Sequence, residues 1–164
     1  MQIDELDRAL LRLLLEEPRA GMRAYARILG IARGTVQSRL ARMERSGVIA
    51  DFAPSLDVAA LGFPVLAFVY LHTAQGRLEA VVRNLVTIPE VLEAYTIAGD
   101  GDVHCRVVAR DNPHLEHVIQ RLIGTPGVVR TRTEIALRRR LAPRTLPLVT
   151  QPRKAEVSIS PPSG

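Results

Sequence analysis

The stretch Gly30–Ile49, GIARGTVQSRLARMERSGVI, decides the fold of the N-terminal part of the chain. At 3.6 residues per turn, Val36, Leu40 and Met43 share one stripe of a helix. The other side presents hydroxyl, amide and guanidinium groups, which bind the base edges and phosphates of duplex DNA. A merely solvated amphipathic helix has the same pattern, so the flanking sequence has to decide.

The flanking sequence predicts two further helices before this one. Residues 4–16 are leucine-rich with an acidic first turn, and residues 22–29 are apolar at helical spacing up to Gly30. A third helix over 33–46 follows a short turn that contains glycine, which is the spacing of a helix-turn-helix. The sequence therefore predicts that the third helix reads DNA. We also expect a short strand over 48–52.

The exposed side of the third helix supplies the candidate DNA contacts. Short polar side chains and one arginine are candidates for base edges: Thr35, Gln37, Ser38 and Arg39. The other arginines are candidates for phosphates: Arg33, Arg42, Arg45 and, from the second helix, Arg23.

The charge of the chain is unevenly distributed. The net charge is +5 over 164 residues, yet residues 1–50 hold 9 Lys and Arg against 6 Asp and Glu, while residues 51–142 hold 10 against 10. This asymmetry favours a basic DNA reader joined to a neutral domain that binds a ligand or a partner. The single cysteine and the lack of a long apolar run lead us to expect a cytoplasmic protein that binds no membrane.

An internal repeat organises the second half of the chain. Apolar residues and a proline recur at a constant offset of 37 positions, from Leu78 to Leu115 and from Pro89 to Pro126. Each copy predicts a strand, a helix and a second strand, with the first strands at 65–71 and 103–109. Asn112 before Pro113 marks the start of the second helix as its N-cap.

Two such units in tandem predict a βαββαβ ferredoxin-like sandwich, so the whole chain is of the α+β class. Helices then cover one sheet face, and an apolar uncovered face makes a homodimer the expected assembly. The predicted boundaries are 1–50 for the helix-turn-helix domain, 51–63 for a linker, and 64–142 for the ferredoxin-like domain. Residues 143–164 are proline-rich without apolar periodicity, which is typical of a disordered tail.

The segment Gly99–Asp102 joins the two repeats. Its Asp-Gly pair favours a hairpin turn, which accounts for Gly101. Asp102 begins an apolar strand, where a carboxylate is costly unless it is paired. An acceptor for an ammonium group beside glycine N–H donors also fits a free amino acid, and the residues alone leave both interpretations open.

Catalytic and metal sites have weaker support. His114 and His117 lie one helical turn apart, with Cys105 as a third candidate ligand, but no metal-binding motif is present and ordinary packing is the simpler interpretation. The chain has no phosphate-binding loop, serine elbow or paired catalytic carboxylates, so we expect neither a cofactor nor an enzyme.

Taken together, the sequence resembles the Lrp/AsnC (feast/famine) family of transcriptional regulators over residues 2–142. The most specific similarities are Ile3–Asp7, Val36–Ile49, Gly99–Asp102 and Pro126–Val128. The resemblance implies dimers, assemblies of up to four dimers, and an amino acid bound near the Gly-Asp-x-Asp loop. The effector contacts that it implies are Gly99, Asp100, Gly101 and Asp102, with Thr96, Ala98 and Thr131 as weaker candidates.

Two helix starts depart from the family pattern, which has Ser or Thr at each. Ala32 precedes the third helix and Gly21 precedes the second. The loss of the Ser or Thr cap at Ala32 costs about 1 kcal/mol of helix stability.

The sequence thus predicts a regulator that binds a pseudo-palindromic operator as a homodimer and responds to an amino acid or a related small molecule. An architectural DNA-binding protein without an effector is one alternative. A tetrapyrrole decarboxylase-like enzyme on the same fold is the other, because the chain has four histidines.

Overall fold

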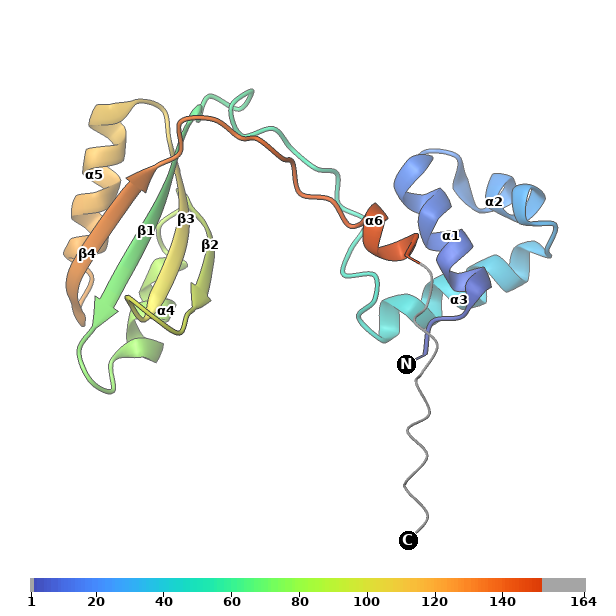
Figure 1. Cartoon of the computed structure of the whole chain (residues 1–164), viewed down its shortest axis with the longest axis horizontal. Helices are drawn as coiled ribbons and strands as arrows, with labels where there is room; N and C mark the ends of the chain where they lie inside the picture. The colour runs from blue at the N-terminus through green and yellow to red at the C-terminus, as the bar shows by residue number, and fades with distance from the viewer. Residues whose placement is uncertain (1, 152–164) are drawn as a thin grey trace, which may run out of the picture. The chain divides into compact units, whose positions relative to one another are not determined.

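The computed structural model describes residues 2–151 (Figure 1). They form two compact units: residues up to 54 together with those from 142 onward, and residues 55–141. The chain therefore crosses between the units twice, near residue 54 and near residue 141. No helix in the described part of the chain is long and apolar enough to cross a membrane.

The N-terminal unit contains the three expected helices, α1 (Glu5–Glu16), α2 (Gly21–Leu29) and α3 (Arg33–Arg45). Each contributes its apolar stripe to one small core, which consists of Leu10, Leu13, Tyr25, Ala26, Val36, Leu40 and Met43. Gly30 ends α2 in the left-handed conformation, at φ 65°, and so turns the chain towards α3.

The N-termini of the helices in this unit differ in whether a side chain caps them. Asp4 caps α1 in a capping box with Asp7, in which each carboxylate accepts the other residue's backbone N–H. Ala32 occupies the N-cap of α3 in an extended conformation and offers no side-chain bond, as expected. The N-cap of α2 is Ala20, not Gly21, which is the first residue of the helix.

Two segments of this unit differ from the expectation. Residues 48–52 form bends and coil, and no other described segment pairs with them as a strand. Leu146–Val149, in the expected tail, form the short helix α6, which packs on α1. Arg8 of α1 donates to the carbonyl of Val149 at 3.2 Å. The rest of the expected tail, residues 152–164, lies outside the described residues.

The second unit confirms the βαββαβ order that the repeat predicts. Its elements are β1 (Val65–Thr73), α4 (Leu78–Leu85), β2 (Val91–Thr96), β3 (Val103–Ala109), α5 (Asn112–Ile123) and β4 (Val128–Ile135). The sheet is antiparallel with the order β2-β3-β1-β4, so the first strands of the two repeats are central neighbours (Figure 1). Asp111, not Asn112, is the N-cap of α5, and its carboxylate accepts from the His114 backbone N–H.

Both helices cover the same face of this sheet. Ala67, Val69 and Leu71 of β1 are fully buried against the helices, among residues such as Val81 and Val118. At the start of β4, Gly127 has φ 102°, and a Cβ there would lie 2.9 Å from the Cβ of Arg77. The glycine is therefore needed for the close approach of this turn to the residue before α4.

The opposite face of the sheet is mixed and not the purely apolar surface that we expected. Phe68 stacks on His104 with ring centroids 5.4 Å apart, and the Arg132 guanidinium lies 4.3 Å above the ring of Tyr70. An ion pair joins Arg106 to Glu93 on the same face. Aromatic residues and arginine are nevertheless enriched at the cores of protein interfaces, whereas acidic residues such as Glu93 are depleted there.

Candidate nucleic-acid interface and effector loop

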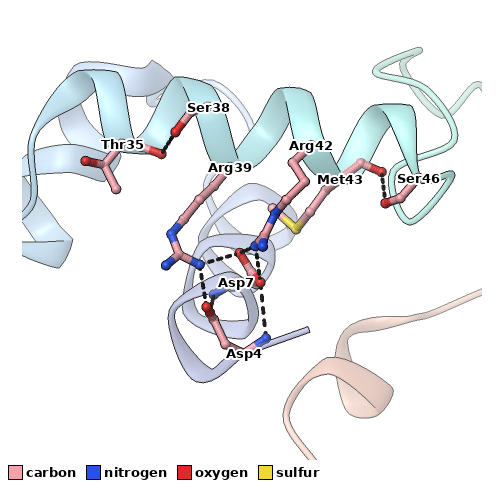
Figure 2. Close-up of polar contacts among 8 residues, drawn as sticks. All are labelled: Asp4, Asp7, Thr35, Ser38, Arg39, Arg42, Met43 and Ser46. Carbon is pink, nitrogen blue, oxygen red and sulfur yellow. Dashed lines mark hydrogen bonds and ion pairs between the residues drawn. The ribbon is translucent and has the colours of Figure 1, made fainter. Parts of the chain in front are cut away.

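Helix α3 presents one polar side to solvent. Val36, Leu40 and Met43 are buried, while Gln37 and Ser38 are exposed and Thr35 is half-buried. The Ser38 hydroxyl donates to the Thr35 carbonyl at 3.0 Å, which fixes its rotamer and leaves its oxygen as an acceptor (Figure 2).

Basic side chains surround the start and the end of this exposed surface. Arg23 and Arg33, which are both exposed, line a shallow depression together with Ala20, Gly21 and Met22 at the N-termini of α2 and α3. Two guanidinium groups beside the N–H groups of helix N-termini suit a phosphate. Arg45 is exposed at the opposite end of α3.

Arg39 and Arg42 lie differently from the other candidates (Figure 2). Arg39 Nη1 donates to Asp4 Oδ2 at 2.6 Å and to Asp7 Oδ1 at 2.8 Å. Arg42 Nη2 contacts both oxygens of Asp7, at 2.7 and 2.6 Å. The two guanidinium groups therefore bind the N-terminus of α1, a contact that the sequence did not predict for them.

This ion-pair cluster of Asp4, Asp7, Arg39 and Arg42 has a buried and an exposed end. The Asp7 side chain is completely buried, whereas that of Asp4 is 50% exposed. The Arg39 hydrogen bond and the Asp7 backbone N–H hold the pKa of Asp4 below its ordinary value. Sequence reasoning missed the cluster because it attributed the acidic first turn of α1 to the helix dipole alone.

The loop at residues 99–102 connects β2 to β3 in the other unit. Gly99 and Gly101 have φ of 135° and 119°, which only glycine adopts without strain. Asp100 lies 60% exposed, with Oδ2 2.9 Å from Arg132 Nη1 and Oδ1 3.6 Å from His72 Nε2. The loop is therefore attached to two strands that no sequence motif connected with it.

Asp102 has the partner that a carboxylate directly before the apolar strand β3 requires. Its Oδ2 accepts from the backbone N–H of Thr73 at 2.6 Å and from the Thr73 hydroxyl at 3.0 Å. These bonds, the backbone one first, lower the pKa of Asp102. The carboxylate thus joins the base of the loop to the end of β1.

The weaker effector candidates lie in different surroundings. Thr96, the last residue of β2, and Ala98, which directly precedes the loop, are both exposed. Thr131 pairs with Leu71, so it faces the helix-covered side of the sheet, whereas Arg132 pairs with Tyr70 and faces the open side.

Two of the three candidate metal ligands, His114 and Cys105, have ordinary structural roles, and the third, His117, is exposed. His114 accepts from the Arg110 backbone N–H at Nδ1, and its Nε2 lies 3.2 Å from Glu90 Oε1. Cys105 is buried in the core of the sheet, and this burial raises the pKa of its thiol to about 11. Among the described residues no three His, Cys, Asp or Glu side chains are grouped in a way that could hold a metal ion.

Comparison with known proteins agrees with this arrangement. Residues 3–50 match the winged helix-turn-helix DNA-binding family, and residues 66–146 match the Lrp/AsnC ligand binding domain. The HTH-type transcriptional regulator FL11 of Pyrococcus horikoshii is 30% identical over 146 residues, which cover 89% of this chain and 97% of that protein. The chain belongs to the Lrp/AsnC family of transcriptional regulators.

Solved structures of Lrp/AsnC proteins share the fold along nearly their whole length. AsnC of E. coli superposes with a TM-score of 0.83 at 25% identity, over 90% of this chain and 100% of that chain. The feast or famine regulatory protein of M. tuberculosis, solved in complex with L-methionine, gives 0.81 at 30% identity over 88% and 98%. The chain is accordingly a transcriptional regulator with a helix-turn-helix DNA-binding domain and a ligand-binding domain.

Proposed function

We propose that this regulator binds a pseudo-palindromic operator as a homodimer and that an amino acid controls its DNA affinity or its assembly. The observation that supports DNA reading most directly is the exposed polar face of α3, whose opposite face is fixed in the core. Thr35, Gln37 and Ser38 then contact base edges, and Arg33, Arg45 and Arg23 contact phosphates.

Arg39 and Arg42 have a different place in this proposal. Because their guanidinium groups bind Asp4 and Asp7, we assign them to the support of α3 and not to base reading. Both side chains stay partly exposed, Arg39 by 24% and Arg42 by 43%.

The open sheet face is the surface that we propose for dimerisation. It offers Phe68, Tyr70 and His104, which lie on the sheet face opposite to the two helices of this unit. A two-fold dimer presents two copies of α3 to successive major grooves, about 34–36 Å apart, and therefore requires a pseudo-palindromic operator. Further association into a tetramer of dimers is the larger assembly that the family resemblance implies.

An amino acid is the effector class that fits the loop at Gly99–Asp102. The M. tuberculosis relative was solved with L-methionine, and a free amino acid needs an acceptor for its ammonium and donors for its carboxylate. Asp100 is the exposed acceptor, the backbone N–H groups of Gly99 and Gly101 are the candidate donors, and Asp102 holds the loop through Thr73. Of the weaker candidates, Thr96 and Ala98 lie beside the loop, whereas Thr131 is on the other sheet face.

We propose no enzymatic activity, since the relatives that match along the chain are named as transcriptional regulators. A regulator that binds the operator works where the chromosome is, so we retain the cytoplasm as its location. An architectural protein without an effector remains the competing hypothesis.

A thermal-shift screen of the twenty amino acids, with and without bound DNA, tests the proposal. At 100 times its Kd, an effector that binds only the folded state stabilises it by about 2.7 kcal/mol. We expect one or a few amino acids to raise the melting temperature, and Asp100→Ala to remove that response while operator binding persists. Stabilisation by none of the twenty, in either condition, would favour the architectural alternative.

A further inference from the structure

Asp7 is a fully buried carboxylate between α1 and α3, and its acceptor positions are filled. It accepts from the Asp4 backbone N–H, once from Arg39 and twice from Arg42, at 3.1, 2.8, 2.7 and 2.6 Å. A carboxylate has about four acceptor sites. The side chain therefore has no capacity left for a partner outside the chain.

A buried ion cluster contributes orientation more than stability. Removing charges from water costs several kcal/mol per ion, and apolar residues of similar size often stabilise a core as well. Arg42 Nε is also buried without a hydrogen-bond partner among the described residues, which is a further cost of this geometry. We therefore look for the role of this cluster in the orientation of the helices that it joins.

The ion-pair cluster restrains the rotation of α3 about its own axis. Arg39 and Arg42 are three positions apart on one side of α3, and both reach the same carboxylate (Figure 2). Rotation of α3 about its axis would draw at least one guanidinium away from Asp7. Gln37 and Ser38, which are exposed on the same helix, are thereby set at one angle to the DNA.

We propose that Asp7 is a positioning residue for sequence recognition: it holds Arg39 and Arg42 so that α3 presents its reading face in one orientation. The inference rests on the proposed reading of DNA by α3. It assigns specificity to a residue of α1 that contacts no base, and it predicts that Arg42 supports α3 without contacting a phosphate.

Two other roles for Asp7, a purely electrostatic one and a purely stabilising one, predict different changes in DNA affinity. If Asp7 acted only as a charge, its neutralisation would strengthen binding to every duplex, because a negative charge near the phosphates is lost. If it acted only on stability, its loss would lower the folded fraction and weaken binding to all duplexes by the same factor. A positioning role lowers the ratio of specific to non-specific affinity.

The test uses the full chain, a duplex selected by the native protein from a random-sequence library, and a scrambled duplex of the same length. Asp7→Asn is expected to lower the affinity ratio by about tenfold or more, which is the effect of about one mismatched base pair. Asp7→Glu, which keeps the charge, should recover part of the ratio. An unchanged ratio in Asp7→Asn, with both affinities raised or both lowered, would overturn the proposal.

Arg42→Gln and Arg45→Gln form a matched pair on the same helix, and they decide the matter even if Asp7→Asn does not fold. Arg45 is exposed, so its loss should reduce the slope of log affinity against log salt by about 0.9, the value for one phosphate contact. Arg42→Gln keeps Arg39 on Asp7 and should lower the affinity ratio with an unchanged slope. A slope reduced as in Arg45→Gln would show that Arg42 binds phosphate and would refute the inference. Failure of the native chain to select any sequence would instead refute the proposed function.

Discussion

At the scale of single residues, Asp4 is the titratable end of the ion-pair cluster. Its pKa is lowered below the ordinary 3.8, first by the hydrogen bond from Arg39. A carboxyl group whose folded-state pKa is depressed contributes stability above its unfolded pKa and loses it as the pH falls through the folded value.

We therefore expect Asp4→Asn to destabilise α1 and α3 slightly at neutral pH, by about 0.2–1 kcal/mol, because the pair is partly exposed and Asn preserves the helix cap. The difference in the free energy of unfolding between the variant and the native chain should stay constant down to about pH 5. It should disappear below pH 3.8, where Asp4 of the native chain becomes protonated. Hydrogen exchange of α3 amides as a function of pH measures it. A deficit that grows in acid would contradict the assignment.

Cys105 gives a second prediction at this scale. Its thiol is fully buried and its pKa is raised to about 11, so little nucleophilic thiolate forms near neutral pH. We expect native protein to react with a thiol reagent at pH 8 only as fast as it unfolds, and denatured protein to react at once. Rapid reaction of the native chain would show that β3 opens or is less buried than in this structure.

At the scale of elements, the uncapped start of α3 offers a direct test of helix energetics. Ala32 has the extended conformation of an N-cap, at φ −67° and ψ 144°, but no side-chain acceptor. Ala32→Ser should therefore stabilise the N-terminal unit by about 1 kcal/mol. Chemical denaturation measures the gain in the free energy of unfolding, and hydrogen exchange of the α3 amides shows whether the gain lies in this helix.

Ala20→Ser is the matched control for this prediction. Ala20 precedes α2 in a helical conformation, at φ −68° and ψ −33°, in which a serine does not act as a typical N-cap. Its substitution should have a much smaller effect. Equal stabilisation by both variants would indicate a general effect of the hydroxyl and not the repair of a missing cap.

The elements themselves were largely predictable from local patterns. Helical spacing located α3 to within one residue, and the 37-residue repeat located both βαβ units and their closing prolines. What escaped prediction depends on long-range contacts. The short helix α6 packs on α1, which lies far away in the sequence, and residues 48–52 lack the pairing strand that their composition alone could not provide.

The site was less predictable than the fold for the same reason. From the charge pattern of α3 we predicted that all its arginines contact DNA. The sequence did not show that Arg39 and Arg42 bind Asp7, which precedes them by 32 and 35 residues. Likewise, the loop motif indicated Asp100 and Asp102 but not their partners Arg132 and Thr73. The one sequence feature that indicated such a partner was a carboxylate next to an apolar segment. At Asp102 this feature predicted that the carboxylate is paired, and Thr73 is the partner in the structure.

At the scale of the whole molecule, the open sheet face is the surface that the dimer proposal requires. Phe68→Asp places a charge at the middle of this face and should convert the dimer to a monomer, which sedimentation analysis detects. Val86→Asp is the control, since Val86 is 84% exposed at the end of α4 on the other side of the sheet. Dissociation by Val86→Asp alone would place the interface on the helical side.

The most direct measurement of the central claim compares the DNA sequences that the native chain and its Gln37→Ala variant select from a random duplex library. Gln37 is exposed on α3, and its amide suits an adenine edge. The native chain should select a pseudo-palindrome with half-sites about one helical turn apart. The variant should retain binding but lose preference at one position in each half-site. An identical motif from both proteins, or none from the native chain, would contradict the reading of DNA by α3.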